Sequence, residues 1–253
     1  MKESITFTPA PDGLLAQLSL SAVEVQLWSA FVDLPAERVR EFERGLSADE
    51  RERAQRFVFE RDRNRSIVSR GFLRALLSRY TGHSAQSIPI ENGNKGKPHW
   101  RCGGIHFNVS HSEKLIVIGF TRVGPLGVDI EHLRVLLDAE SIAERFFSPA
   151  EARNFTETPL RLRAQAFFNC WTRKEAYVKA VGDGLHIPLD SFEVTFRPGE
   201  NPTLSCLGGD SERATGWSVY HLEPSPGYVG ALVMNSGRLP VQAWSLDLSR
   251  ESY

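Results

Sequence analysis

The sequence has little of the chemistry that disulfide frameworks and zinc sites require. Its 253 residues include only three cysteines, Cys102, Cys170 and Cys206, which lie far apart and show no CxxC or Cys/His spacing. An odd number of widely separated cysteines predicts small, buried, unpaired side chains in a reducing compartment. The first residues, MKESITFTPAPDG, also lack the apolar core of a signal peptide. We therefore expect a cytoplasmic protein.

A dominant charge and a long apolar run are missing as well. Thirty Lys and Arg residues stand against 31 Asp and Glu residues, for a formal net charge of −1, and no run of about 18 apolar residues could span a bilayer. The composition therefore gives no reason to expect nucleic acid or a membrane as a partner. Residues 40–79 are locally basic, with eleven Arg against seven acids. We interpret most of these arginines as a solvated helix face and a minority as available to an anion.

Two stretches of the chain repeat one order of predicted elements. In each, a strand (23–32 or 126–131) is followed by a helix that opens at a capping serine, Ser47 or Ser148, and then by a long helix. We predict an α+β fold made of two similar α+β halves with a ligand cleft between them. The halves are residues 1–122 and 123–253. The long helices are predicted at 66–80 and 161–181, and further strands at 105–120, 191–196, 217–222 and 228–234.

A carboxylate interrupts the apolar face of the second long helix. Phe168, Trp171 and Val178 recur with Glu175 at helical spacing, so Glu175 lies on the apolar stripe and Lys179 follows one turn later. Burial removes hydration from a carboxylate and is costly unless a cation or hydrogen bonds compensate. The alternative is an ordinary Glu-to-Lys pair on a helix surface.

Two further acids stand in the strand LGVDIEHLR, residues 126–134. Asp129 and Glu131 are two positions apart, which places both carboxylates on one face of the strand. Acidic oxygens without His or Cys suit a hard cation such as Mg²⁺, which takes its remaining ligands from water and phosphate. The alternative is a strand end at which Asp129 caps a turn and Glu131 faces solvent.

Two loops carry groups that can meet a phosphate. GNKGKP (93–98) brings Lys95 and Lys97 into a glycine-rich loop, although Pro98 stands where a Walker A loop requires Ser or Thr. FNVSHS (107–112) adds hydrogen-bond donors at a strand end, although a lone Ser-His pair is usually a structural turn. Its candidate residues are Asn108, Ser110 and His111.

In this order and spacing, GKP, FNVSHS, GVDIE and FFNCWTRKEAYVKAVGDGL resemble the 4′-phosphopantetheinyl transferases of the surfactin-synthetase-activating type, over about residues 45–235. The resemblance implies a pseudo-dimeric α+β fold that binds coenzyme A between its halves. It also implies a divalent cation on the pyrophosphate, Mg²⁺ or alternatively Mn²⁺. It implies transfer of the phosphopantetheine arm to a serine of an apo acyl or peptidyl carrier protein and release of adenosine 3′,5′-bisphosphate. It is also consistent with a monomer that has internal pseudo-twofold symmetry.

The resemblance also implies roles for individual residues. Asp129, Glu131 and Glu175 would be the metal ligands, and Asp129, Glu175 and Lys179 the catalytic groups. Where relatives carry a second basic residue and an upstream arginine, this chain has Glu50 and Asn92. The residues expected to bind coenzyme A are Arg53, Ser66, Gly96, Lys97, Pro98, Asn108, Ser110, His111, Asp129, Glu175 and Lys179, with Lys97, Ser110 and His111 on the 3′-phosphate and Gly96 and Pro98 near adenine.

Some alternatives remain open from the sequence. The general base could be Glu175 or a metal-bound water. The carrier could dock near residues 138–160, where Phe146 and Phe147 either meet an apolar carrier face or belong to the core. The chain could also be a non-catalytic binder of carrier protein or coenzyme A, although all three acids stand. A nucleic-acid binder lacks support from interleaved aromatic residues or from the overall charge.

Overall fold

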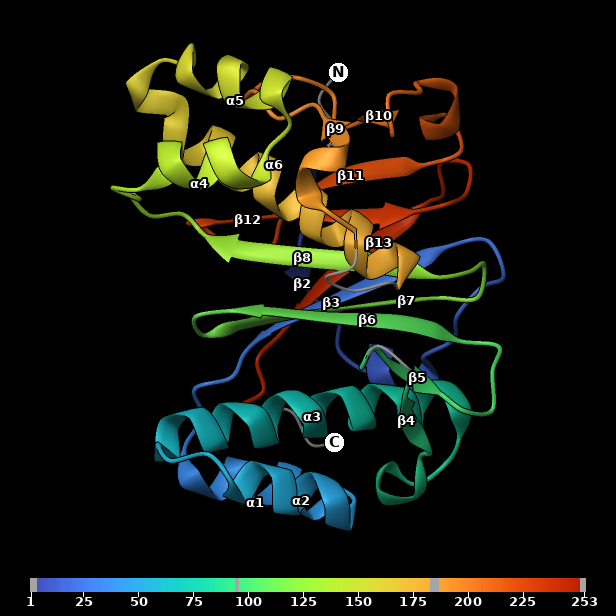
Figure 1. The fold of residues 1–253 in the computed structure, drawn as a ribbon. Helices are drawn as coiled ribbons and strands as arrows, with labels where there is room; N and C mark the ends of the chain where they lie inside the picture. Colours follow the sequence, from blue (N-terminus) through green and yellow to red (C-terminus); the bar gives the residue numbers. More distant parts are fainter. Residues whose placement is uncertain (1–3, 94–95, 183–186, 251–253) are drawn as a thin grey trace.

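The computed structural model describes residues 4–93, 96–182 and 187–250. Two β-sheets lie face to face at its centre, and helices cover the outer face of each sheet (Figure 1). The helices are α1 (Ala36–Arg44), α2 (Ala48–Gln55), α3 (Glu60–Thr81), α4 (Ala139–Phe146), α5 (Pro149–Thr156) and α6 (Leu160–Val181).

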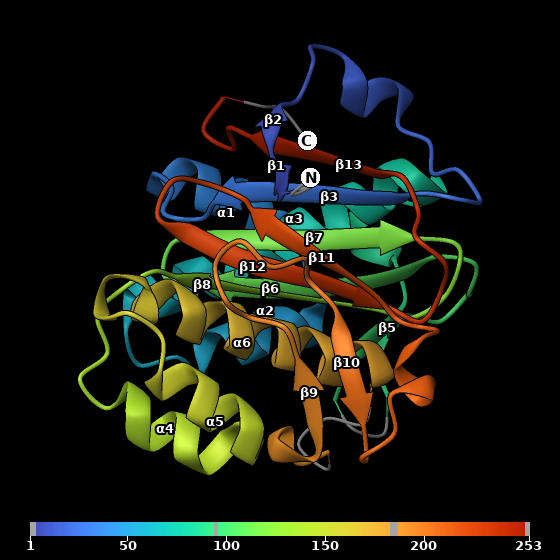
Figure 2. The ribbon, with the colours of Figure 1, turned by 90° about the horizontal axis from the view of Figure 1, so that it is seen from above.

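One sheet has the strand order β2-β13-β3-β7-β6 and the other β1-β11-β12-β8, and two short pairs, β4-β5 and β9-β10, stand apart. The strands are β1 (Ser4–Thr6), β2 (Thr8–Pro9), β3 (Val25–Phe31), β4 (Ile90–Asn92), β5 (Pro98–Trp100), β6 (His106–Ser112), β7 (Leu115–Thr121), β8 (Leu126–His132), β9 (Phe192–Val194), β10 (Leu204–Leu207), β11 (Ser218–Glu223), β12 (Tyr228–Met234) and β13 (Val241–Leu246). Helices α1 to α3 cover the first sheet, and α4 to α6 cover the second (Figures 1 and 2).

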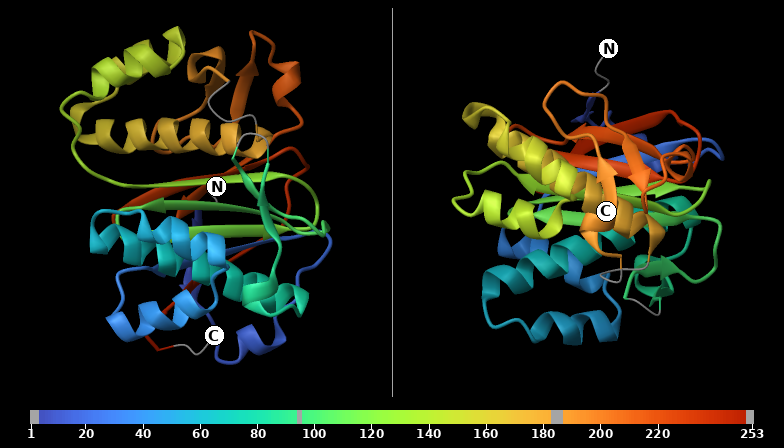
Figure 3. Two further views of the ribbon diagram at one scale, coloured as in Figure 1. Left: turned by 60° about the horizontal axis from the view of Figure 1, so that its bottom comes forward. Right: turned by 45° about the horizontal axis from the view of Figure 1, so that its top comes forward.

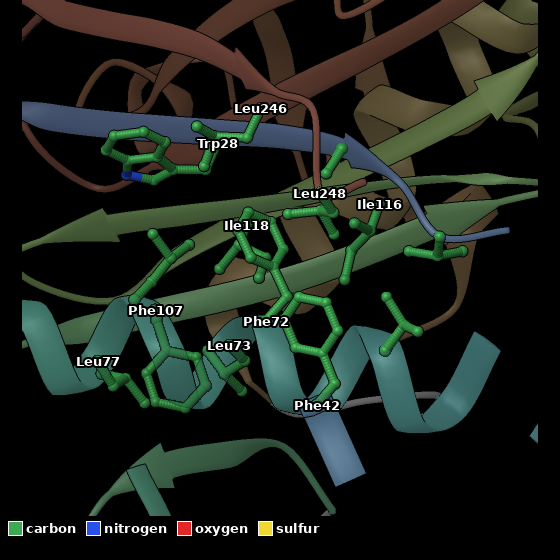
Figure 4. Packing of buried hydrophobic residues seen from close by; sticks show 14 of the residues in the cluster. Trp28, Phe42, Phe72, Leu73, Leu77, Phe107, Ile116, Ile118, Leu246 and Leu248 are labelled. Carbon is green, nitrogen blue, oxygen red and sulfur yellow. The ribbon is translucent and has the colours of Figure 1, made fainter. Parts of the chain in front are cut away.

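The layers explain why the central strands are apolar on both faces. In β3, Trp28 and Ala30 pack toward α3, whereas Val25 and Leu27 pack against the other sheet. Strands buried on both faces give continuous apolar runs instead of an apolar-polar alternation. The core beneath α3 is filled by large side chains of helix and sheet, among them Phe72 (Figure 4).

The predicted repetition is visible in the order and ends of the elements. We call the segment from β3 to β7 the N-terminal half and the segment from β8 to β12 the C-terminal half. Strands β3-β7-β6 adjoin in one half as β8-β12-β11 do in the other. Helices α3 and α6 each have 22 residues and end at a glycine in the left-handed region, Gly82 (φ 73°) and Gly182 (φ 81°). The predicted caps at Ser47 and Ser148 are both confirmed as capping boxes.

A buried cation holds the capping box of each half against its long helix. In the N-terminal half Arg74 of α3 pairs with Glu50, the capping-box glutamate of α2. In the C-terminal half Lys174 of α6 is fully buried and pairs with Glu151 of α5 at 2.7 Å. Lys174 belongs to the sequence signature, yet it lies in the core, where it also donates to two backbone carbonyls.

Each end of the chain adds a strand to the sheet of the opposite half. Strand β1 pairs with β11 of the C-terminal half, and β13 pairs with β3 of the N-terminal half. The predicted boundary between residues 122 and 123 remains a prediction. The β4-β5 pair of the N-terminal half reaches toward the end of α6 (Figure 3), where Lys97 donates to the carbonyl oxygens of Lys179 and Leu126.

Some sequence expectations need correction. Helices α1 and α4 and strands β1 and β13 were not predicted, because each is short or pairs with a strand far away in the sequence. The cysteines are not uniformly buried: Cys170 is buried, whereas Cys102 is exposed and Cys206 intermediate. Lys95 and the signature residues 183–185 lie outside the described residues. Within the described part of the chain, no helix combines the length and apolarity needed to cross a membrane.

Helix α6 crosses β8 at a glycine. A Cβ atom at Gly127 would overlap backbone atoms of Ala176 and Ala180, which lie in α6, so the close approach requires the missing side chain. We expect Gly127→Ala to lower the free energy of unfolding by about 1–3 kcal/mol or more in urea titrations, because α6 must move away from the strand. Gly124→Ala, at a position with open space around it, is the matched control and should change stability by less than about 0.5 kcal/mol. Equal stabilities of the two variants would contradict the close packing.

Candidate active site

The two sheets meet along the edge strands β6 and β8, a boundary that we call the seam (Figure 1). Strand β8 pairs with β12 on one side and β6 with β7, so each has one edge left over. Across the seam, backbone N–H groups of β8 donate to side chains of β6 that stand two residues apart. The three bonds run from Val128 N to Asn108 Oδ1 (2.8 Å), from Ile130 N to Ser110 Oγ (3.2 Å) and from His132 N to Ser112 Oγ (3.1 Å).

Asp129 is buried in the seam with only one of its oxygens engaged. Asp129 is only 7% exposed. Oδ1 accepts hydrogen bonds from Lys179 Nζ at 2.7 Å and from Ser110 Oγ at 3.0 Å. Oδ2 is also buried, and it has no hydrogen-bond partner among the described residues. Burial raises the pKa of Asp129 above its ordinary value, although the charge on Lys179 opposes the shift.

Glu131 follows at the end of β8 and is anchored in a similar way. Its Oε2 accepts from Ser112 Oγ at 2.8 Å and from Arg134 at 3.3 Å. The residue is half-buried, and Oε1 has no hydrogen bond to the described part of the chain. The predicted placement of both acids on one face of one strand is therefore present in the structure.

Glu175 approaches these acids from α6. It is half-buried, and its carboxylate has no hydrogen bond or ion pair within the described residues. Burial raises the pKa of Glu175, the negative charge of Asp129 raises it further, and Lys179 acts in the opposite direction. Lys179, one helical turn after Glu175 in α6, bonds to Asp129 of β8, so the helix and the strand place the predicted acids in one region of the structure.

The two predicted lysines, Lys179 and Lys97, both donate hydrogen bonds to backbone carbonyl oxygens of the protein. Besides Asp129, Lys179 donates to the Val128 carbonyl and to Ser110 Oγ, both at 3.2 Å. Lys97 donates to the carbonyl oxygens of Leu126 (3.0 Å) and Lys179, so it joins the N-terminal half to β8 and to the end of α6. Burial, together with the nearby charge of Lys179, lowers the pKa of Lys97 to about 8.

A cavity of 680 Å³ in the N-terminal half adjoins the seam at His111. Three of the residues expected to bind coenzyme A line it, namely Ser66, Pro98 and His111. Desolvation and the charge on Lys179 lower the pKa of His111, which favours a neutral imidazole. The wall also carries the arginines Arg61, Arg65 and Arg70.

The other predicted nucleotide-binding residues lie elsewhere. Arg53 lines a separate, polar cavity of 360 Å³, and among the described residues Arg70 alone lines both this cavity and the larger one. Gly96 is exposed in the loop before β5, with a φ of 83°. Asn108 and Ser110 are buried, 5% and 3% exposed, and their side chains bond across the seam.

Sequence reasoning missed three residues of this region. Ser112 and Arg134 hold Glu131, and Arg70 lies between the two cavities. A signal for Ser112 was present, because Asn108, Ser110 and Ser112 alternate along a strand and so share one face. Arg70 follows Ser66 by four residues, which is one helical turn.

The three predicted metal ligands do not close into a finished metal centre. Among the described residues, no group of three or more His, Cys, Asp and Glu side chains has the arrangement of a metal site. The bonds of Asp129 to Lys179 and of Glu131 to Ser112 and Arg134 direct one oxygen of each acid toward the protein. The assignment of Asp129, Glu131 and Glu175 as metal ligands remains a prediction.

Of the two phenylalanines considered for the carrier surface, Phe146 and Phe147, one lies in the core. Phe147 is 2% exposed and packs against Phe155, Phe167 and Phe196. Of the two alternatives left open for Phe147, the structure therefore supports the core and not the carrier surface. Phe146 is half-buried and contacts the edge of Trp171.

Both halves of the chain match models of one family. Residues 36–121 match a model described as 4′-phosphopantetheinyl transferase, N-terminal, and residues 125–233 match the 4′-phosphopantetheinyl transferase superfamily.

Individual relatives agree with these models. The chain is 34% identical to 4′-phosphopantetheinyl transferase HetI of Nostoc sp., over 90% of this chain and 93% of the relative. It is 30% identical to 4′-phosphopantetheinyl transferase Sfp of Bacillus subtilis (strain 168), over 79% and 88% of the two chains. The match to HetI covers both halves of this chain and nearly the whole of the relative. This chain therefore belongs to the 4′-phosphopantetheinyl transferase superfamily and is a transferase.

Proposed function

We propose that this enzyme moves the 4′-phosphopantetheine arm of coenzyme A onto a serine hydroxyl of an apo acyl or peptidyl carrier protein. The reaction depends on Mg²⁺ and releases adenosine 3′,5′-bisphosphate. The observation that carries the proposal is the gathering of Asp129, Glu131 and Glu175 with Lys179 at the seam, where Asp129 Oδ2 is buried without a protein partner. Because one chain supplies both sides of the seam, we propose that it acts as a monomer.

The residues at the seam fit a hard divalent cation. A buried carboxylate oxygen without a partner is costly, and a bound cation would offset that cost. Burial and, to a smaller extent, the charge of Asp129 raise the pKa of Glu175, and a bound cation would favour its ionised form. The donors are all carboxylates, which suits Mg²⁺ and also Mn²⁺.

The arginine-lined cavity is the proposed place for the nucleotide of coenzyme A. Ser66 and His111 line it together with Arg70, and all three can donate hydrogen bonds to phosphate oxygens. Lys97 and Ser110 point into the seam, so we assign the 3′-phosphate contacts to His111 and the cavity wall. Lys97 adds positive charge at the boundary between the nucleotide and the acids.

The chemistry follows from what these residues can do. The serine oxygen forms a bond to the phosphorus that carries the pantetheine arm, and the bond from that phosphorus to the leaving adenosine 3′,5′-bisphosphate breaks. Mg²⁺, held by Asp129, Glu131 and Glu175, would supply charge neutralisation at the pyrophosphate. Lys179 adds a positive charge beside Asp129 and stabilises the departing phosphate.

Glu175 is the proposed acceptor of the serine proton. Its carboxylate is free of protein hydrogen bonds among the described residues, and its pKa is raised by burial and by Asp129. A carboxylate oxygen that is free of protein hydrogen bonds can accept a proton from a hydroxyl within hydrogen-bonding reach. The transferred proton also removes one negative charge from a crowded acidic site.

Transfer can be measured directly by mixing the enzyme with coenzyme A, Mg²⁺ and a panel of apo carrier proteins. We expect the intact mass of at least one carrier to increase by a single phosphopantetheine arm, and EDTA to abolish the change because the acids then lack their cation. No transfer to any carrier, or transfer that persists in EDTA, would contradict the proposal.

Glu175→Gln in the same assay distinguishes a role of Glu175 as proton acceptor from a role in binding coenzyme A. We expect kcat to fall by about 10²–10⁴-fold while the affinity for coenzyme A weakens by less than about tenfold. Glu37→Gln, a change at an exposed glutamate of α1, should leave transfer unchanged. Comparable losses of turnover and of coenzyme A affinity in Glu175→Gln would count against the base role.

The raised pKa of Glu175 also predicts how stability depends on pH in EDTA. The stability associated with a raised carboxyl pKa is present below the unfolded-state pKa and is lost as the pH rises through the folded-state pKa. Glutamine carries no titrating carboxyl group and cannot lose this stability, so the variant should have a higher Tm than wild type at neutral pH. The difference should vanish in acid, below the ordinary glutamate pKa. A lower Tm of Glu175→Gln at neutral pH would refute the assignment, and Glu37→Gln is again the control.

A further inference from the structure

The two acids of β8 are held by matching sets of donors. Asp129 Oδ1 accepts from a β6 serine, Ser110, and from Lys179. Glu131 Oε2 accepts from the next β6 serine on that face, Ser112, and from Arg134. In each carboxylate one oxygen is therefore bound by a serine and a basic side chain. The second oxygen of Asp129, Oδ2, is buried without a partner among the described residues, and the hydrogen bonds of Glu131 to described residues all go to Oε2.

Each serine hydroxyl has both of its main hydrogen-bonding functions engaged. Ser112 Oγ accepts the backbone N–H of His132 at 3.1 Å and donates its single proton to Glu131 Oε2 at 2.8 Å. Ser112 is 8% exposed, so water has little access to compete for either bond. A hydroxyl fixed on both sides in this way limits the rotation of the Glu131 carboxylate.

We propose that Ser112 is a positioning residue that holds Glu131 with Oε1 directed to the cation and the pyrophosphate, as Ser110 holds Asp129 with Oδ2 free. This inference rests on the proposed function and adds a residue that the sequence motifs did not assign. Ser112 itself touches neither the substrate nor the cation. Arg134 supports the same oxygen of Glu131 and stacks over Phe168 at 5.0 Å, which fixes its guanidinium.

The inference makes the arrangement of the halves part of the chemistry. Ser112 belongs to the N-terminal half, whereas Glu131 and Glu175 belong to the C-terminal half. A shift of β6 along β8 would break the serine bonds to the carboxylates and to the β8 backbone together, because the same hydroxyls make both. The cation ligands are therefore oriented only when the two halves have the register seen here.

The test compares Ser112→Ala, which removes the hydroxyl, with Ser112→Thr, which keeps it on a side chain suited to a strand. Binding of Mn²⁺ is measured by electron paramagnetic resonance with saturating coenzyme A and no carrier, so that no turnover occurs. We expect Ser112→Ala to bind Mn²⁺ about 10-fold more weakly. Its kcat for transfer should fall similarly, while the KM for coenzyme A changes less than about twofold. Ser112→Thr should recover most of both losses.

Ser218→Ala is the control for the loss of a serine hydrogen bond within a strand, at a half-buried position. Ser218 lies in β11 of the same sheet as β8 and donates to the Ser236 carbonyl at 2.8 Å, away from the acids. It should lose stability comparable to that of Ser112→Ala, about 1 kcal/mol, and retain wild-type Mn²⁺ affinity. Thermal unfolding in EDTA establishes that each variant is folded.

The outcomes separate this inference from the function on which it rests. Wild-type Mn²⁺ affinity in Ser112→Ala, or equal losses in Ser112→Ala and Ser112→Thr, would overturn the positioning role while leaving the transfer proposal intact. Transfer by the wild-type enzyme that needs no divalent cation would overturn the metal site and this inference together.

Discussion

The unpaired edge of β8 is the constraint on which the rest of the structure depends. A strand edge exposes N–H groups that must find acceptors when they are buried, and β6 supplies Asn108, Ser110 and Ser112 as acceptors in place of a carbonyl ladder. Side chains therefore stand between the sheets where backbones would otherwise meet. This geometry brings hydroxyl donors beside Asp129 and Glu131, so the solution to an edge-strand problem also builds the acidic site.

The acids at the seam carry an energetic cost that the protein offsets only in part. Lys179 and Ser110 compensate one oxygen of Asp129, yet burial still raises its pKa. Glu175 has no compensating bond within the described residues, and its pKa is raised as well. Functional sites commonly retain such unfavourable groups, because a pre-formed anionic site binds its cation and substrate without further rearrangement. The close contact of α6 with Gly127 keeps Glu175 over the strand despite this cost.

Local rules predicted the elements and the identity of the acids from sequence. Capping serines, the apolar stripe of α6 and the two-residue spacing of Asp129 and Glu131 depend on near neighbours, and the structure confirms each of them. The pairing of β1 with β11 and of β13 with β3 depends on residues more than 200 positions apart, which no local pattern encodes. The direction of a side chain was not accessible from the sequence either. Ser110 was expected at a phosphate and bonds across the seam, and Phe147, which the sequence left open between a carrier contact and the core, lies in the core.

The central claim is that the seam binds a divalent cation together with the pyrophosphate of coenzyme A. The most direct measurement is anomalous scattering from Mn²⁺ in crystals of the enzyme grown with coenzyme A and no carrier. The account predicts one strong peak within bonding distance of Asp129 Oδ2, next to Glu131 and Glu175 and in contact with the pyrophosphate. A pyrophosphate bound away from the seam, or a cation that leaves Asp129 Oδ2 without a ligand, would contradict it.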